Sequence, residues 1–310
     1  MSRGMDDSVN NPNISRIRRS DRLKEAVVTQ RSNKPRRKKK SLWLLEIIML
    51  IVAAIFIFPI LLVAVNSLKP DSEILHNAFQ LPQTIQWSNF STAWTMMKYS
   101  STFLHTLIVT VGGVVGIVII SSMAGYKLSR TKTRYSTMIF FLCIIPMVIS
   151  FSSIMITLVQ VAKTVHLMHS LWGLIIIYWG LLAPGAIFLY HGFAKTIPVE
   201  IDESAEMDGC SPFRAFASII MPLLQPITST IVVLTSLAIW NDFLLPLLVI
   251  GQSDKTKTLM LSTYVFQGNY TNDWGLLLAG LLMTVLPIVI FFMFMQRFII
   301  NGIASGAVKG

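Results

Sequence analysis

Charge is scarce in this sequence. Asp, Glu, Lys and Arg make up only 13% of the 310 residues, whereas 53% are hydrophobic, and the mean hydropathy is +0.63. This composition is too apolar for an ordinary water-soluble domain, because about a quarter of all residues in such domains are charged. The composition therefore predicts that lipid surrounds most of the chain.

Motifs that carry chemistry are also missing. The sequence has no glycine-rich phosphate loop with its lysine, no nucleophile elbow and no catalytic site of paired carboxylates. The five histidines and the two cysteines, Cys143 and Cys210, have no metal-ligand spacing, and the predicted topology makes a disulfide between the cysteines implausible. We therefore predict no catalytic, cofactor-binding or metal-binding residues, and no ATP hydrolysis by this chain.

Long apolar runs are what the sequence has in abundance. A helix needs about 20 apolar residues to cross about 30 Å of hydrocarbon. Six runs pass this test or nearly do: residues 47–65, 106–126, 135–161, 171–190, 226–250 and 275–295. The runs are continuous, unlike the alternating strands of a barrel. The sequence predicts an all-α, polytopic membrane protein whose six transmembrane helices form one domain over residues 42–310.

The basic residues predict the orientation of these helices. With the N-terminus inside, 21 Lys and Arg lie on the inner side and 5 on the outer side, so both termini are expected to be cytoplasmic. Residues 1–41 are polar and are predicted to be a disordered tail. Its basic cluster, residues 36–40, would be attracted to anionic lipid by about 1 kcal/mol per residue. The tail lacks interleaved aromatics, so nucleic-acid binding is not expected.

One charged residue lies inside an apolar run. Asp242 follows Trp240 and Asn241 in the fifth run, and an ionisable group at that depth costs about 3 kcal/mol or more unless it faces a bundle interior or water. Two interpretations remain open. The three residues form part of a solute path or its gate, or Asp242 is a structural hydrogen-bond node between helices.

The connection between the fourth and fifth runs predicts a helix–turn–helix. Pro198 is placed for the first turn of a short helix, acidic residues follow it, and Gly209 suits the position just after that helix. Ser211 and Pro212 are typical of an N-cap followed by the first residue of a second helix, expected to end near Pro222.

The second helix would carry an apolar stripe. Phe213, Phe216 and Ile220 fall at i, i+3 and i+7, which places them on one helical face. A helix–turn–helix with such a stripe has the shape of a knob that docks in a groove of another protein. The residues alone do not identify that partner.

The same loop resembles the EAA loop of ABC importer permeases. The match consists of Glu203-Ser204-Ala205, Gly209 and Ile220-Met221-Pro222, with Ser204 and Met221 departing from the usual Ala and Leu. The residues for which the resemblance implies coupling to an ATPase are Glu203, Ser204, Ala205, Gly209, Phe213, Ile220 and Pro222.

Further runs, residues 66–69, 124–130, 240–247 and 302–310, are similar to the carbohydrate branch of these permeases, the family of the smaller subunit of the maltose transporter. The resemblance implies a type I importer in a bacterial plasma membrane. Its expected partners are a second homologous permease, two cytoplasmic ATPase subunits that hold ATP and Mg, and an extracellular binding protein that delivers a sugar or oligosaccharide. An importer of another solute and a secondary transporter remain as alternatives, but the loop from Glu203 to Pro222 does not fit the latter.

Overall fold

The computed structural model describes residues 39–251, 255–267 and 273–307. Within these ranges the regular elements are helices, which confirms the predicted all-α class. The chain divides into two compact units, Met1–Ile60 and Leu61–Gly310. Residues 1–38 of the predicted tail lie outside the described residues. Residues 308–310, the end of the run 302–310 that carries the family resemblance, also lie outside them.

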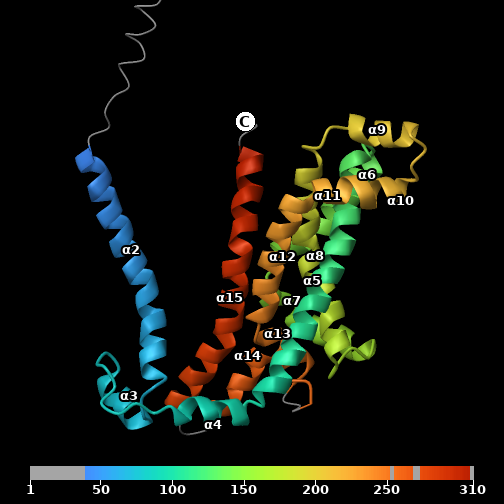
Figure 1. Cartoon of the computed structure of the whole chain (residues 1–310). Helices are drawn as coiled ribbons and strands as arrows, with labels where there is room; N and C mark the ends of the chain where they lie inside the picture. Colours follow the sequence, from blue (N-terminus) through green and yellow to red (C-terminus); the bar gives the residue numbers. More distant parts are fainter. Residues whose placement is uncertain (1–38, 252–254, 268–272, 308–310) are drawn as a thin grey trace, which may run out of the picture. The chain divides into compact units, whose positions relative to one another are not determined.

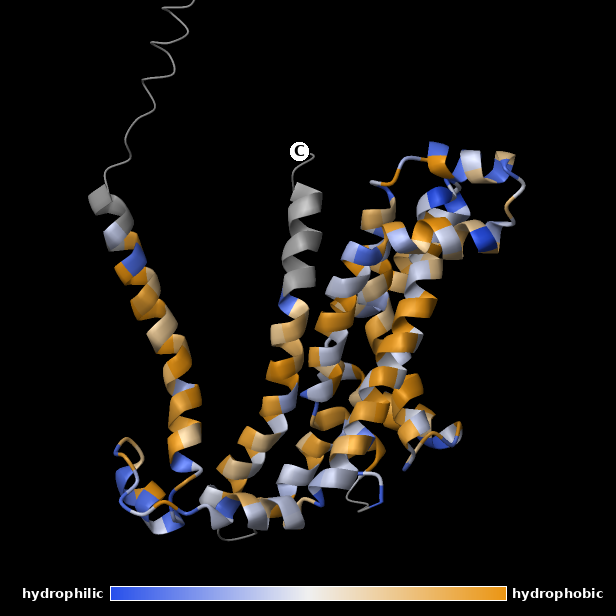
Figure 2. Cartoon of the chain, viewed as in Figure 1, coloured by the Kyte–Doolittle hydropathy of each residue, from blue (hydrophilic) through white to orange (hydrophobic). Residues whose placement is uncertain are grey.

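Four helices in the described ranges are long and apolar enough to cross a membrane. They are α2 (Lys39–Asn66), α5 (Tyr99–Arg130), α8 (Leu171–Ala194) and α15 (Trp274–Ala307). Figure 2 shows hydrophobic residues along these helices and hydrophilic residues where the chain leaves them. They contain the first, second, fourth and sixth predicted runs, so these four predictions are confirmed as continuous apolar helices.

The third predicted run is not one straight helix. It consists of α6 (Arg134–Ile144), the 3-10 turn η1 (Ile145–Val148) and α7 (Phe151–Thr164), with a bend of 106° between the two parts. Pro146 lies in η1 and removes a backbone donor there. Proline alone does not cause such a break, because Pro184 lies inside α8. The backbone of Ser150, extended at ψ 137°, completes the change of direction.

The fifth predicted run is also interrupted. Helix α12 (Gln225–Trp240) is followed by three residues without helical structure and then by α13 (Leu244–Val249). At its other end α12 meets the segment Pro212–Leu223 at an angle of 76°. With its 16 residues, α12 is shorter than the roughly 20 residues that a membrane crossing needs. The described chain therefore has four continuous candidate spans and two bent pairs of helices.

Small residues let helix α5 pack closely on α8. A Cβ atom at Gly116 would lie 2.1 Å from the indole of Trp179, and one at Gly125 would lie 2.6 Å from Cβ of Tyr190. The indole Nε1 of Trp179 also donates a hydrogen bond of 3.0 Å to the Gly112 carbonyl. Helix α5 is therefore an interior helix of the second unit, and its position is set by backbone approach.

The segment between α2 and α5 folds around a buried lysine. It contains α3 (Asp71–Asn77) and α4 (Ser88–Met96). Lys69 is 0% exposed, and its Nζ donates to the carbonyls of Asn77 at 2.9 Å and Gln80 at 2.6 Å. Asn89 then donates from Nδ2 to the Lys69 carbonyl at 2.9 Å. The run 66–69, which carries part of the family resemblance, is thus the structural centre of this segment.

We expect Lys69→Met to lower the stability of the chain. Methionine fills the same space, but it leaves the carbonyls of Asn77 and Gln80 without this donor, and a hydrogen bond to a charged group is worth about 1.5–3 kcal/mol. A loss of about 3 kcal/mol corresponds to roughly 5–10 °C in Tm for a chain of this size. Thermal unfolding of the purified protein in detergent measures the shift. Lys163→Met, at an exposed lysine, is the control, and equal Tm values for the two variants would contradict the assignment.

Candidate functional site

The loop of residues 196–225 begins with the short helix α9 (Glu200–Met207). Acidic side chains occupy its first turn, where they interact favourably with the positive end of the helix dipole. Pro198 lies two residues before the helix begins, so the prediction that it occupies the first turn is wrong. Ala205 faces inward and is 4% exposed, whereas Glu203 and Ser204 are exposed. The Ser204 hydroxyl donates to the Glu200 carbonyl at 2.6 Å.

A glycine closes this helix, as predicted. Gly209 has φ +76°, its N–H donates to the Glu206 carbonyl, and the N–H of Cys210 donates to the Ala205 carbonyl, both at 3.0 Å. This pair of bonds is a Schellman motif, in which the left-handed residue is usually glycine. The direction of the second arm therefore depends on the backbone of Gly209.

The second arm consists of α10 (Pro212–Ala215), the π-helical turn η2 (Phe216–Ile220) and α11 (Met221–Leu223). The Ser211 side chain accepts from the Arg214 N–H, which confirms the predicted N-cap. The predicted apolar stripe is wrong, because Phe213 is 69% exposed and Ile220 is 1% exposed. The π-turn breaks the 3.6-residue period between them. The arm continues one residue past Pro222 and turns at Leu224.

The exposed end of this loop carries large apolar side chains. Met207 at the end of α9 is 87% exposed and Phe213 at the start of α10 is 69% exposed. Figure 1 shows α9 and α10 as a pair of helices at the end of α5, α8 and α12 that lies away from α4. An exposed apolar patch of this kind on a projecting hairpin is typical of a contact with another protein.

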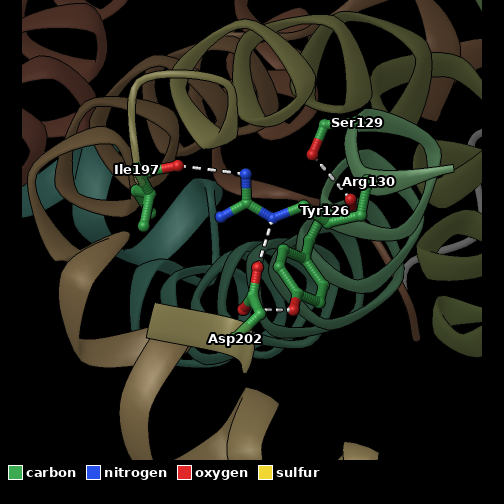
Figure 3. Close-up of polar contacts among 5 residues, drawn as sticks. All are labelled: Tyr126, Ser129, Arg130, Ile197 and Asp202. Atoms are coloured by element: carbon green, nitrogen blue, oxygen red, sulfur yellow. Dashed lines mark hydrogen bonds and ion pairs between the residues drawn. The ribbon is translucent and has the colours of Figure 1, made fainter. Parts of the chain in front are cut away.

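Helix α5 holds the base of the loop through Tyr126 and Arg130 (Figure 3). The Tyr126 hydroxyl donates to Oδ1 of Asp202 in α9 at 2.8 Å, and Arg130 Nε lies 2.6 Å from Oδ2 of the same carboxylate. Arg130 Nη1 also donates to the Ile197 carbonyl at 3.0 Å. We call these three side chains, Tyr126, Arg130 and Asp202, the anchor.

Sequence reasoning did not find the anchor. Arg130 contributed only to the count of basic residues, and Asp202 only to the acidic first turn of α9. The single signal in the sequence is that Tyr126 and Arg130 belong to the run 124–130, which carries the family resemblance. Their partner Asp202 follows Tyr126 by 76 positions and Arg130 by 72, and helical periodicity does not predict contacts over such distances.

Two open cavities lie beside the anchor. The larger, of about 1240 Å³, is lined by the connection from α5 to α6 and by the exposed face of α9. The smaller, of about 520 Å³, lies between α5 and the second arm and includes Phe213. Tyr126, Arg130 and Asp202 line both cavities. The anchor is therefore the wall that separates them.

The second candidate region is the break between α12 and α13. Trp240 is 5% exposed and donates from Nε1 to the Thr284 carbonyl of α15 at 3.0 Å, while Asn241 is exposed. Asp242 accepts from the Leu244 N–H at 3.0 Å through Oδ1. Trp240 and Asp242 thus contact different neighbours, so the structure does not join the three predicted residues in one polar patch.

Asp242 also faces a cavity. Its Oδ2 accepts a hydrogen bond of 2.9 Å from the Tyr178 hydroxyl of α8. Both side chains line a cavity of about 380 Å³, whose other walls are mostly apolar and come from η1, α7, α8, α12 and α13. This cavity lies at the two helix breaks described above, where irregular backbone is tolerated because protein or water surrounds it.

Apolar helices of membrane-spanning length, together with an anchored and projecting helix–turn–helix, are typical of a membrane component that docks on another protein. A sequence profile described as "Binding-protein-dependent transport system inner membrane component" matches residues 116–304. The chain belongs to this family of transport subunits, which are not enzymes.

Relatives match almost over their full length. The chain is 39% identical to the "Probable starch degradation products transport system permease protein AmyC" of Thermoanaerobacterium thermosulfurigenes, over 86% of this chain and 97% of that protein. It is 32% identical to the "Melibiose/raffinose/stachyose import permease protein MelC" of Bacillus subtilis (strain 168), over 87% and 98%.

A solved structure shares the fold. A chain of a bacterial ABC transporter involved in the import of the acidic polysaccharide alginate superposes with a TM-score of 0.71 over 84% of this chain and 97% of that chain. The two sequences are 21% identical, so this likeness concerns the fold. The first cavity and the anchor lie within the segment that the family profile matches.

Proposed function

We propose that the chain is a permease subunit of an ATP-driven importer of sugars or oligosaccharides. The observation that carries the proposal is the anchored loop of residues 196–225, with its glycine-closed turn and its apolar tip at Met207 and Phe213. In the proposal, the tip docks in a groove of a cytoplasmic ATPase subunit, which holds ATP and Mg. A second homologous permease and an extracellular binding protein complete the importer.

The proposed topology has six spans with both termini cytoplasmic. Four spans are the continuous helices, the bent pair of α6 and α7 supplies a fifth, and α12 together with α13 supplies the sixth. The distribution of Lys and Arg, 21 against 5, supports this orientation, because short cytoplasmic loops carry an excess of basic residues. In this orientation the 196–225 loop lies in the cytoplasm, on the same side as the ATP supply. The membrane in the proposal is the plasma membrane of a bacterium.

The proposed solute follows from the relatives. Those reported above are named for starch degradation products and for melibiose, raffinose and stachyose, and a further relative from Bacillus subtilis (strain 168) is named for arabinooligosaccharides. These solutes share several adjacent hydroxyl groups and no net charge. A neutral oligosaccharide is therefore the class that we expect this importer to carry.

The proposed mechanism requires no covalent chemistry in this chain. A ligand shifts a conformational equilibrium only through different contacts in the two states. ATP binding would close the ATPase pair, carry the 196–225 loop with it and favour the outward-open arrangement of the helices. In this proposal Asp242 contributes to the solute path or its gate, at the break in α12–α13.

Uptake by the reconstituted complex tests the proposal. The chain is co-expressed with a candidate second permease, ATPase and binding protein from the same organism, and ATP-dependent uptake is measured in proteoliposomes with labelled maltotriose, raffinose and an amino-acid mixture. We expect uptake of an oligosaccharide that requires ATP and the binding protein. Uptake of the amino acids alone would contradict the sugar assignment, and uptake driven by an ion gradient without ATP would contradict the importer class.

We expect Glu203→Lys to weaken docking of the ATPase. The reversed charge costs the helix only about 0.3–1 kcal/mol, so a larger effect has to arise at the contact with the partner. Co-purification of the ATPase subunit in detergent measures docking. Glu203→Gln keeps the side-chain length and removes only the charge, so it should lose less ATPase than Glu203→Lys. Full retention in the lysine variant would exclude Glu203 from the contact.

A further inference from the structure

The anchor joins α5 to both arms of the loop. Tyr126 donates to Asp202 in α9, and its ring lies 5.4 Å, centroid to centroid, from the ring of Phe216 in η2. One side chain of α5 therefore touches the arm before Gly209 and the arm after it. These contacts come from a helix that is distant in sequence, although the loop is covalently continuous with α8 and α12.

Arg130 holds this arrangement together. Its guanidinium pairs with Asp202 and donates to the Ile197 carbonyl, which lies in the connection from α8 to α9. It also lies 5.6 Å from the centre of the Tyr126 ring, a cation–π distance. Only 15% of the Arg130 side chain and 20% of that of Asp202 are exposed, so water screens the ion pair weakly.

The opposite end of α5 contacts α4, which precedes it in the chain, and α14, which follows α13. The ring of Tyr99 stacks on that of Trp94 in α4 at 4.3 Å. The Thr106 hydroxyl accepts a hydrogen bond of 2.7 Å from the Leu259 N–H at the start of α14 (Leu259–Ser262). Since α5 is one helix of 32 residues, a displacement at Arg130 moves these contacts as well.

The connection from the loop to α12 is bent. Helix α12 meets the second arm at 76°, with a single residue, Leu224, between α11 and α12. A bend of this kind can absorb a displacement by rotating at a few backbone angles. The anchor bypasses it, because Arg130 and Tyr126 fasten the loop directly to an unbroken helix.

We infer that Arg130 is the positioning residue that makes the 196–225 loop and α5 move as one body, so that motion of the ATPase reaches the opposite side of the membrane through α5. This inference rests on the proposed function and adds the route of transmission to it. Arg130 acts through Asp202 and Tyr126, and it need not touch ATP or solute.

The first test separates uptake from ATP hydrolysis. Both rates are measured in proteoliposomes of the full importer with wild-type chain, Arg130→Gln, Asp202→Asn and the double variant. We expect uptake per ATP hydrolysed to fall about tenfold in each single variant, with the ATPase subunit retained. The double variant should be no worse than either single variant, because both substitutions remove the same interaction. Losses that multiply in the double variant would overturn the inference.

Two further variants control for folding. Arg130→Lys keeps the positive charge but loses the planar group that pairs with the carboxylate and donates to a carbonyl at once, so it should recover coupling only in part. Lys132→Gln removes a positive charge from an exposed residue just after α5, and it should behave as wild type. If Arg130→Gln fails to reach the membrane, uptake per ATP hydrolysed is compared between Arg130→Lys, Asp202→Asn and the wild-type chain instead.

The second test measures the link itself. Spin labels at the native Cys210 and at Ser100→Cys, in a Cys143→Ser background, report the distance between the loop and the far end of α5. In the otherwise wild-type complex, we expect the same distance without nucleotide and with ATP. In the Arg130→Gln complex, we expect the distance to differ between these two conditions. A distance that already changes without the Arg130 substitution would overturn the inference.

The outcomes distinguish the inference from the proposed function. A wild-type complex that neither retains an ATPase nor imports a solute would overturn both. A wild-type complex that imports normally, together with an Arg130→Gln complex of equal coupling, would overturn the inference and leave the proposed function in place.

Discussion

Gly209→Val is expected to abolish the stimulation of ATP hydrolysis by solute-loaded binding protein, while the chain still inserts. The φ of +76° is strongly disfavoured for a β-branched residue, and holding it there costs of order 1–3 kcal/mol. The backbone can escape this cost by leaving the left-handed region, and the two arms then meet at another angle. Stimulated ATPase activity and retention of the ATPase subunit are measured on the same purified complex.

The space around Gly209 makes this experiment specific. A Cβ atom at this position would meet nothing within 4 Å, so a clash does not explain a loss of coupling. Asn tolerates the left-handed region better than other non-glycine residues, and Gly209→Asn should therefore retain most of the stimulation. Gly192→Val, at another open position in α8, controls for the added side chain. Full stimulation in Gly209→Val would exclude this turn as part of the coupling element.

The turn at Gly209 was predictable because its cause is local. A glycine after a short amphipathic helix, followed by Ser and Pro, is sufficient to predict a helix end and a new helix start. The apolar runs were predictable for a similar reason, since the length of hydrocarbon to be crossed fixes the length of the run. These signals lie within a few residues of the feature that they determine.

The helix breaks and the anchor were not predictable in this way. Hydropathy measures whether a segment is apolar, and both residues 135–161 and 226–250 remain apolar across their bends. The π-turn η2 shifts Phe213 and Ile220 to different faces although their spacing suits one face. Arg130 and Asp202 meet only because the close packing of α5 on α8 brings the end of α5 to the loop. Tertiary contacts of this kind leave no periodic pattern in one sequence.

Asp242→Leu is expected to reduce solute uptake by about tenfold or more while the chain reaches the membrane in normal amounts. Leucine adds no desolvation cost, since it removes an ionisable group from the membrane. It removes the acceptor for the exposed Leu244 N–H and for the Tyr178 hydroxyl. Tyr178 is 3% exposed, and leaving a buried donor unsatisfied costs about 1–3 kcal/mol. Uptake in proteoliposomes and the amount of chain in the membrane are measured together.

A conservative variant separates the two interpretations of Asp242. Asn at this position keeps an oxygen that accepts from the N–H groups of α13 and loses the charge. If the carboxylate belongs to the solute path or gate, Asp242→Asn also impairs uptake. If Asp242 is only a structural node, Asp242→Asn transports normally and only Asp242→Leu fails. Tyr178→Phe leaves the carboxylate in the cavity and removes the phenol, so it reports the contribution of their hydrogen bond.

Water access gives an independent test of the path. Asp242 lines a cavity of about 380 Å³, and a residue on a solute path has to contact water in at least one state of the transport cycle. Asp242→Cys, in a background in which Cys143→Ser and Cys210→Ser remove the native thiols, should react with a membrane-impermeant thiol reagent. The reaction rate is compared without nucleotide and with ATP, and it should differ between the two states because the cavity opens to one side at a time. Inertness in both states, combined with normal uptake by Asp242→Asn, would assign Asp242 to helix packing, since a half-buried carboxylate that only accepts from the N-terminus of α13 and from Tyr178 needs neither water nor charge to do so.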